Sequence, residues 1–125
     1  MKTIFALMLL LLLLAGCGQK QEISYKQISQ EKAKEMMAEE AVLILDVRRQ
    51  DEFDAGHIPG AVLLPVESID EASAAAVIPG KDTVVLMYCR SGNRSKTASQ
   101  ALAELGYTNI HEFGGINTWP YEVVK

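Results

Sequence analysis

Cysteine and histidine are scarce in this sequence, with two of each among 125 residues. This scarcity excludes a disulfide-rich scaffold, and we expect no metal site built from these residues. Basic residues are outnumbered by acidic ones, 12 to 16, so we expect no nucleic-acid partner. Nine Gly and four Pro are ordinary numbers, which excludes collagen-like and disordered chains. The length suits one domain and is too short for two of ordinary size.

The sequence also lacks an apolar run long enough to cross a membrane. The longest run, residues 4–15, spans about 18 Å as a helix, against ~30 Å of hydrocarbon in a bilayer. Lys2 precedes this run as a short positive segment. This arrangement is typical of a signal peptide and not of a transmembrane helix.

Residues 14–17, Leu-Ala-Gly-Cys, resemble the lipobox of bacterial lipoproteins. The resemblance implies that Cys17 receives a lipid, that residues 1–16 are removed, and that Cys89 is then the only free thiol. The alternative is an ordinary signal peptide that happens to contain a cysteine. We expect a membrane anchor through Cys17, with residues 17–23 as a polar tether. The location would be extracytoplasmic, facing the periplasm in a Gram-negative host.

Strand-like and helix-like segments alternate along the rest of the chain. Helical spacing predicts helices that begin after the N-cap Ser29 and near Ser95, and others at residues 50–55 and 68–77. Apolar runs predict strands at residues 23–28, 42–45, 61–64, 83–88 and 109–113. This alternation indicates an α/β domain with a parallel sheet.

Cys89 opens a polar loop between the strongest predicted strand and a helix. Ligands of α/β sheets bind at the carboxyl ends of strands, and helix N-termini attract anions. Arg90 and Arg94 flank the loop, and Gly92 permits a tight turn that directs N–H groups inward. We therefore expect a reactive thiolate whose pKa lies below that of a free thiol, with a small oxyanion beside it. The alternative is an inert buried cysteine beside an anion site.

Motifs along residues 25–120 resemble the rhodanese (thiosulfate sulfurtransferase) family. They occur in the family's order: Asp-Val-Arg at 46–48, Glu-Phe at 52–53, Gly-His-Ile-Pro-Gly-Ala at 56–61, Tyr-Cys-Arg-Ser-Gly-Asn-Arg-Ser at 88–95, and Gly-Gly at 114–115 with Trp119. The resemblance implies a single rhodanese-like α/β domain at residues 24–125, with a central, mostly parallel five-stranded sheet flanked by helices on both faces. It also implies sulfur transfer through a persulfide on Cys89, without cofactor or metal. The donor would be a small anionic sulfur compound and the acceptor a thiol or cyanide.

The active-site loop carries four residues between Cys89 and Arg94. The related Cys phosphatases and arsenate reductases carry one more, which makes a wider cradle for phosphate or arsenate. The shorter loop favours sulfur transfer, and a phosphatase or arsenate reductase is the alternative enzyme. A second alternative is a non-catalytic binding module, although inactive relatives commonly lack the cysteine. We expect a monomer.

Individual roles follow from the same motifs. Cys89 is the nucleophile, and the cradle consists of backbone N–H groups of the donor-binding residues Arg90, Ser91, Gly92, Asn93 and Arg94. The Arg94 guanidinium is expected to face either the loop carbonyls or the sulfonate of the donor. Arg90 either attracts anionic donors or is simply solvated.

Four further residues are supporting candidates. Asp46 and Arg48 end a strand on the active-site side, and their structural interpretation pairs Arg48 with Glu52 and Asp46 with loop amides. His57 is a candidate base for Cys89. Its position in a Gly-Pro turn favours a structural role.

Overall fold

A five-stranded parallel sheet organises residues 24–125, the part of the chain that this computed structural model describes. The strands are β1 (Lys26–Gln27), β2 (Leu43–Asp46), β3 (Val62–Leu63), β4 (Val85–Cys89) and β5 (Ile110–Gly115). Their order across the sheet is β1-β5-β4-β2-β3, and every neighbouring pair is parallel. The predicted fold class is confirmed.

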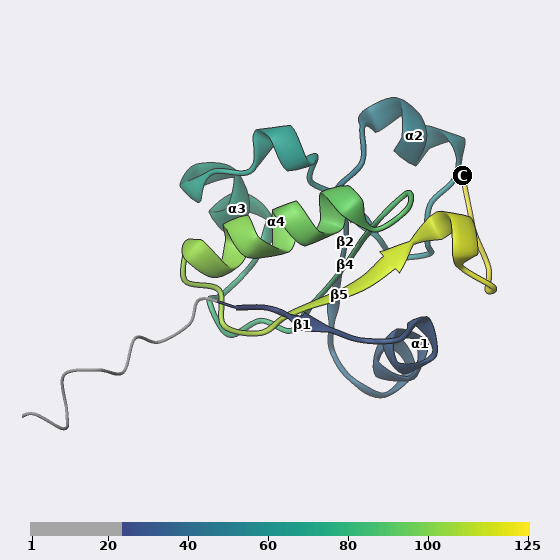
Figure 1. The fold of residues 1–125 in the computed structure, drawn as a ribbon, viewed down its shortest axis with the longest axis horizontal. Coiled ribbons are helices and arrows are strands. Elements are labelled where there is room, and N and C mark those ends of the chain that lie inside the picture. Colours follow the sequence, from purple (N-terminus) through teal and green to yellow (C-terminus); the bar gives the residue numbers. More distant parts are fainter. Residues whose placement is uncertain (1–23) are drawn as a thin grey trace, which may run out of the picture.

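Helices cover both faces of this sheet (Figure 1). Helix α1 (Gln30–Glu39) lies on one face, while α3 (Glu71–Val77) and α4 (Asn93–Glu104) lie on the other. The short helix α2 (Gln50–Ala55) follows β2 at the carboxyl end of the strands. Two 3-10 turns, Val66–Ser68 and Ile116–Thr118, complete the described elements.

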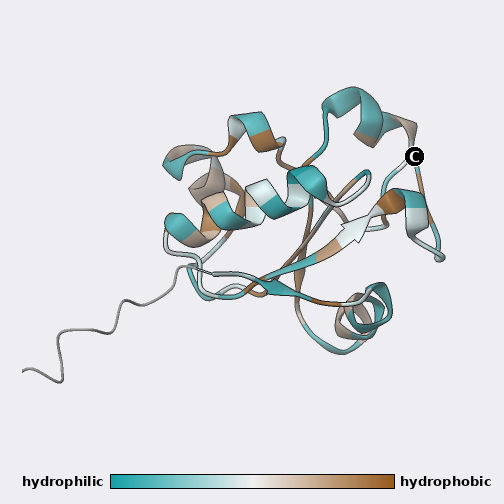
Figure 2. Cartoon of the chain, in the orientation of Figure 1, coloured by the Kyte–Doolittle hydropathy of each residue, from teal (hydrophilic) through white to brown (hydrophobic). Residues whose placement is uncertain are grey.

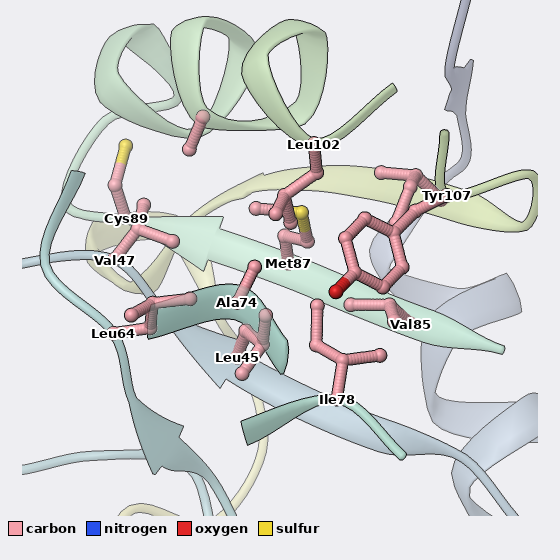
Figure 3. Close-up of a cluster of buried hydrophobic side chains, with 12 residues drawn as sticks. Leu45, Val47, Leu64, Ala74, Ile78, Val85, Met87, Cys89, Leu102 and Tyr107 are labelled. Carbon is pink, nitrogen blue, oxygen red and sulfur yellow. The ribbon is translucent and has the colours of Figure 1, made fainter. Parts of the chain in front are cut away.

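The central strand β4 is buried along its whole length. Its side chains alternate between two cores, as the pleat of a strand requires. Val85, Met87 and Cys89 join the core under α3 and α4 (Figure 3), whereas Leu86 and Tyr88 join the core under α1. Figure 2 shows hydrophobic residues along the central strands, whereas α2 is mostly hydrophilic.

Local sequence signals account for two of the helices. Ser29 caps α1 as predicted, because its hydroxyl oxygen accepts a hydrogen bond from the Lys32 backbone N–H at 3.0 Å. The bounds of α2 agree with the predicted residues 50–55, and Gly56 is its C-cap.

Two helix starts differ from the prediction. Helix α3 begins at Glu71 instead of residue 68, because Asp70 caps it by accepting from the Ser73 backbone N–H at 2.8 Å. Helix α4 begins at Asn93, two residues before Ser95. Gly92 makes this early start possible with a left-handed φ of 104°, so Ser95 lies buried inside the first turn.

The C-terminal segment is hydrogen-bonded to the turn that follows α2. Trp119 is buried, and the backbones of His57 and Val124 exchange two hydrogen bonds of 2.8 Å each. The short chain after Gly115 therefore closes the core under α1.

The expected signal peptide, the lipidation site Cys17 and the tether fall in residues 1–23, outside the described residues. Among residues 24–125, none of the helices combines the length and apolar character needed to span a bilayer.

Candidate active site

Cys89 is the last residue of β4 and is almost fully buried, with 1% of its surface exposed. The chain leaves the strand through Arg90 and Ser91, turns at Gly92 and enters α4. This path returns the Gly92 N–H to the strand end, where it donates a hydrogen bond to the Cys89 Sγ at 3.0 Å. The positive end of α4 therefore faces the sulfur, as the loop composition predicts.

Opposing influences act on the pKa of the Cys89 thiol. Burial is the largest and raises the pKa. The Ser95 hydroxyl and the backbone N–H groups of Ser95, Gly92 and Ser91 lower it by hydrogen bonding to the thiolate. The net effect places the pKa of Cys89 below the usual value of a thiol, in the predicted direction. Hydrogen bonds from the loop and from the first turn of α4, more than the charges of the arginines, outweigh the effect of burial on the pKa of Cys89.

The Arg94 guanidinium contacts Glu52 and not the loop. Its two terminal nitrogens donate to the two Glu52 carboxylate oxygens at 2.6 and 2.9 Å, a bidentate pair. Hydrogen bonding from Arg94 is the main cause that lowers the pKa of Glu52 to about 2. The expectation that Arg94 faces the loop carbonyls is wrong, because α2 places a carboxylate within reach of its guanidinium.

The predicted pair between Arg48 and Glu52 is also wrong. Arg48 precedes the first residue of α2, so the spacing of four that favours pairs on a helix does not apply. Its Nη2 donates to Asp46 Oδ2 and to the Gly56 carbonyl, both at 2.7 Å. Asp46 also accepts from the Arg48 backbone N–H at 3.0 Å, which confirms the expected contact with a loop amide. The buried ion pair between Arg48 and Asp46 stabilises the connection between β2 and α2.

His57 lies in the turn after α2. Its ring stacks on Phe53 with centroids 3.8 Å apart, and its Nδ1 lies 2.9 Å from the Phe53 carbonyl oxygen. These contacts support the structural interpretation of His57 over a role as a base for Cys89.

The remaining loop residues divide into exposed and buried positions. Arg90, Ser91 and Asn93 are exposed, whereas Gly92 is buried beneath them. The Arg90 carbonyl accepts from the Asn117 backbone N–H at 3.1 Å, which ties the loop to the segment after β5. Gly115 packs so closely against this part of the loop that a Cβ there would overlap the Arg90 carbonyl.

Sequence reasoning missed two residues behind the sulfur. The Ser95 Oγ lies 3.4 Å from the Cys89 Sγ, and it donates to Glu112 Oε1 at 2.7 Å. Glu112 belongs to β5 and is 2% exposed. An acidic residue within the strand predicted at residues 109–113 was the signal that could have identified it, because acidic side chains are rarely fully buried without partners.

Comparison with known proteins gives consistent results. Residues 29–121 match the family model of the rhodanese-like domain. Thiosulfate sulfurtransferase PspE of Escherichia coli (strain K12) is 36% identical over 81 residues, covering 65% of this chain and 77% of the relative. Thiosulfate sulfurtransferase GlpE of Coxiella burnetii (strain RSA 331 / Henzerling II) is 36% identical over 96 residues, covering 76% of this chain and 87% of the relative. A solved structure described as a rhodanese with anions from E. coli superposes with a TM-score of 0.61 at 34% identity, covering 68% of this chain and 99% of the other.

Proposed function

Since the chain belongs to the rhodanese-like domain family and is a rhodanese-like sulfurtransferase, we propose that Cys89 carries the transferred sulfur as a persulfide. The observation that carries this proposal is the set of hydrogen-bond donors around the Cys89 sulfur. The Gly92 N–H lies 3.0 Å from the Sγ, and the N–H groups of Ser91 and Ser95 also favour the thiolate. The same donors suit the negative terminal sulfur of a persulfide.

The reaction has two displacement steps. The Cys89 thiolate attacks the outer sulfur of thiosulfate, the new S–S bond forms, and sulfite leaves with the electron pair of the old one. Cyanide or a thiolate then attacks the outer sulfur of the persulfide, and the electron pair of the broken S–S bond returns to Cys89 as thiolate. No oxidant or reductant is consumed, so the residues of the loop need only stabilise negative charge.

An anionic donor fits the charges at the loop. Arg90 is exposed on the loop, while the charge of Arg94 is paired with that of Glu52. Arg90 is therefore the guanidinium that is placed to attract a thiosulfate-like anion from solvent. The relative solved with anions is consistent with this substrate class.

The test is mass spectrometry of the full chain after incubation with thiosulfate. We expect one added sulfur atom on the peptide that contains Cys89, and its removal by cyanide with formation of thiocyanate. Hydrolysis of an aryl phosphate without uptake of sulfur would instead support the phosphatase alternative. Absence of both reactions would support a binding module.

We also propose that the protein is an extracytoplasmic lipoprotein anchored through Cys17. The support is the sequence at residues 14–17, which combines a lipobox pattern with the short apolar run before it. Several acyl chains on Cys17 hold a protein at a bilayer much more firmly than one chain does.

Replacing Cys17 with serine is expected to release the protein from the membrane, because the substituted side chain offers no sulfur for lipid attachment. The measurement is fractionation of cells that express either form, followed by a salt wash of the membranes. Sulfur transfer by the released variant serves as the control for folding. Retention of the Cys17→Ser protein in the washed membranes would contradict the lipid anchor.

A further inference from the structure

Glu112 is a buried carboxylate, and the groups within residues 24–125 that donate hydrogen bonds to it are all neutral. Its Oε1 accepts from the Ser95 hydroxyl at 2.7 Å and from the Gly114 backbone N–H at 2.8 Å. Its Oε2 lies 3.4 Å from the Gln27 side-chain amide. A buried carboxylate without a cation depends on such donors, so the Ser95 hydroxyl matters to Glu112.

The Ser95 hydroxyl has a single proton and several acceptors. Besides Glu112, the carbonyl oxygens of Gly92 and Gly114 lie at 3.1 and 3.4 Å, and the Cys89 thiol donates to the Ser95 oxygen at 3.4 Å. The shortest contact is with the charged group, and hydrogen bonds to charged groups are the stronger ones. The hydroxyl proton is therefore drawn toward Glu112, and a lone pair of the oxygen faces the sulfur.

When Cys89 ionises, the Ser95 hydroxyl lies between two anions, the Cys89 thiolate and the Glu112 carboxylate. The thiolate gains from the Ser95 proton, and so does the carboxylate, but one proton cannot serve both fully. The backbone N–H groups of the loop have no such competitor, because their direction is fixed by the turn at Gly92. Ser95 is thus the adjustable donor of the site.

We propose that Glu112 is a positioning residue of the sulfur-transfer reaction, which holds the Ser95 hydroxyl and so limits how far it stabilises the Cys89 thiolate. This inference rests on the proposed role of Cys89 as sulfur carrier. The cysteine must attack the donor in the first step and leave in the second. Stronger stabilisation of the thiolate improves the leaving group and weakens the nucleophile, so a shared donor keeps both steps possible.

Other charged groups near the site do not replace this contact. Arg94 interacts with the charge of Cys89 but gives its hydrogen bonds to Glu52. Lys96 lines the same surface groove as Glu112, a hollow of about 410 Å³ beside Ser91. Arg90 is exposed. In the described part of the chain, none of these cations forms an ion pair with Glu112.

The test compares alkylation of Cys89 by iodoacetamide as a function of pH in the full chain, measured on the peptide that contains Cys89. Glu112→Gln keeps an oxygen that accepts from Ser95 and Gly114 but removes the negative charge. At pH values below the inflection of the alkylation profile, we expect alkylation to accelerate about threefold to tenfold. This factor corresponds to a fraction of the free energy of one hydrogen bond to a charged group. The inflection should move to lower pH, an effect that a purely structural role of Glu112 would not produce.

The double variant tests whether Glu112 acts through Ser95. Ser95→Ala alone should slow alkylation below the inflection, and the acceleration caused by Glu112→Gln should shrink to less than about twofold in the Ser95→Ala background. Glu104→Gln, which removes an exposed carboxylate at the far end of α4, is the matched charge control and should leave the profile unchanged.

Two outcomes would overturn the inference. An unchanged or slower alkylation in Glu112→Gln would show that the carboxylate does not restrain the thiolate. An equal acceleration with and without the Ser95 hydroxyl would show that the charge acts through space. Uptake of sulfur from thiosulfate, measured on the same samples, separates this question from the proposed function. A wild-type chain that takes up no sulfur contradicts the carrier role, whereas the alkylation profiles alone decide whether Glu112 restrains the thiolate through Ser95.

Discussion

Replacing Cys89 with serine is expected to abolish sulfur transfer, lowering turnover by at least ~10³-fold, the scale on which loss of a catalytic nucleophile acts. The serine oxygen fits the same buried position, so the fold should survive. The loop that favours a thiolate does not make a hydroxyl into a comparable nucleophile, because an alkoxide is far less accessible at neutral pH. The measurement is thiocyanate formation from thiosulfate and cyanide.

The comparison protein for this experiment is the Cys17→Ser variant, which removes the other cysteine of the chain. It should retain full sulfur transfer, and a thermal melt of both variants should agree within a few degrees. Sulfur transfer by Cys89→Ser near the wild-type rate would contradict the assignment of Cys89 as carrier.

Replacing Gly115 with alanine is expected to have the second-largest effect, although the residue bears no functional group. Gly115 has an extended backbone with φ of -131°, so the constraint is space and not strain. An added Cβ would overlap the Arg90 carbonyl and lie 2.6 Å from the Ser91 nitrogen. The loop backbone would have to move, and a displacement of about 1 Å in a catalytic site lowers rates by on the order of a hundredfold.

The measurement is kcat/KM for sulfur transfer together with the pH dependence of Cys89 alkylation. Gly80→Ala is the matched control, since its new Cβ would meet only the ends of the Asp82 and Thr83 side chains. Gly80→Ala should transfer sulfur at the parental rate. A Gly115→Ala chain that folds and transfers sulfur as well as Gly80→Ala would show that the loop has more freedom than its contact with β5 indicates.

The fold was predictable because its signals are local. The cap at Ser29, the closure of α2 at Gly56 and the apolar run of β2 each lie within a few residues of the element that they define. The start of α4 was placed too late because Gly92 lacks a capping side chain. Only the left-handed turn at this glycine reveals that the helix begins at Asn93.

The part of the site that is continuous in sequence could be predicted, whereas the contacts between residues far apart in the sequence could not. The path from Cys89 to Arg94 is one strand end, one turn and one helix start, so sequence spacing describes it well. The partner of Arg94 is Glu52, 42 residues away, and the partner of Ser95 is Glu112, 17 residues away. Such contacts depend on how α2 and β5 are placed relative to α4, and the distance along the sequence does not reveal that.

The common direction of the strands decides where the N-terminal segment joins the domain relative to the active-site loop. All five strands run in the same direction, so the start of β1 lies at the end of the sheet opposite the loop that follows β4. Figure 1 shows this separation, with β1 entering at one side and the loop at the other. With the proposed anchor at Cys17, the domain would therefore join its tether at the end of the sheet that lies away from the sulfur-handling loop.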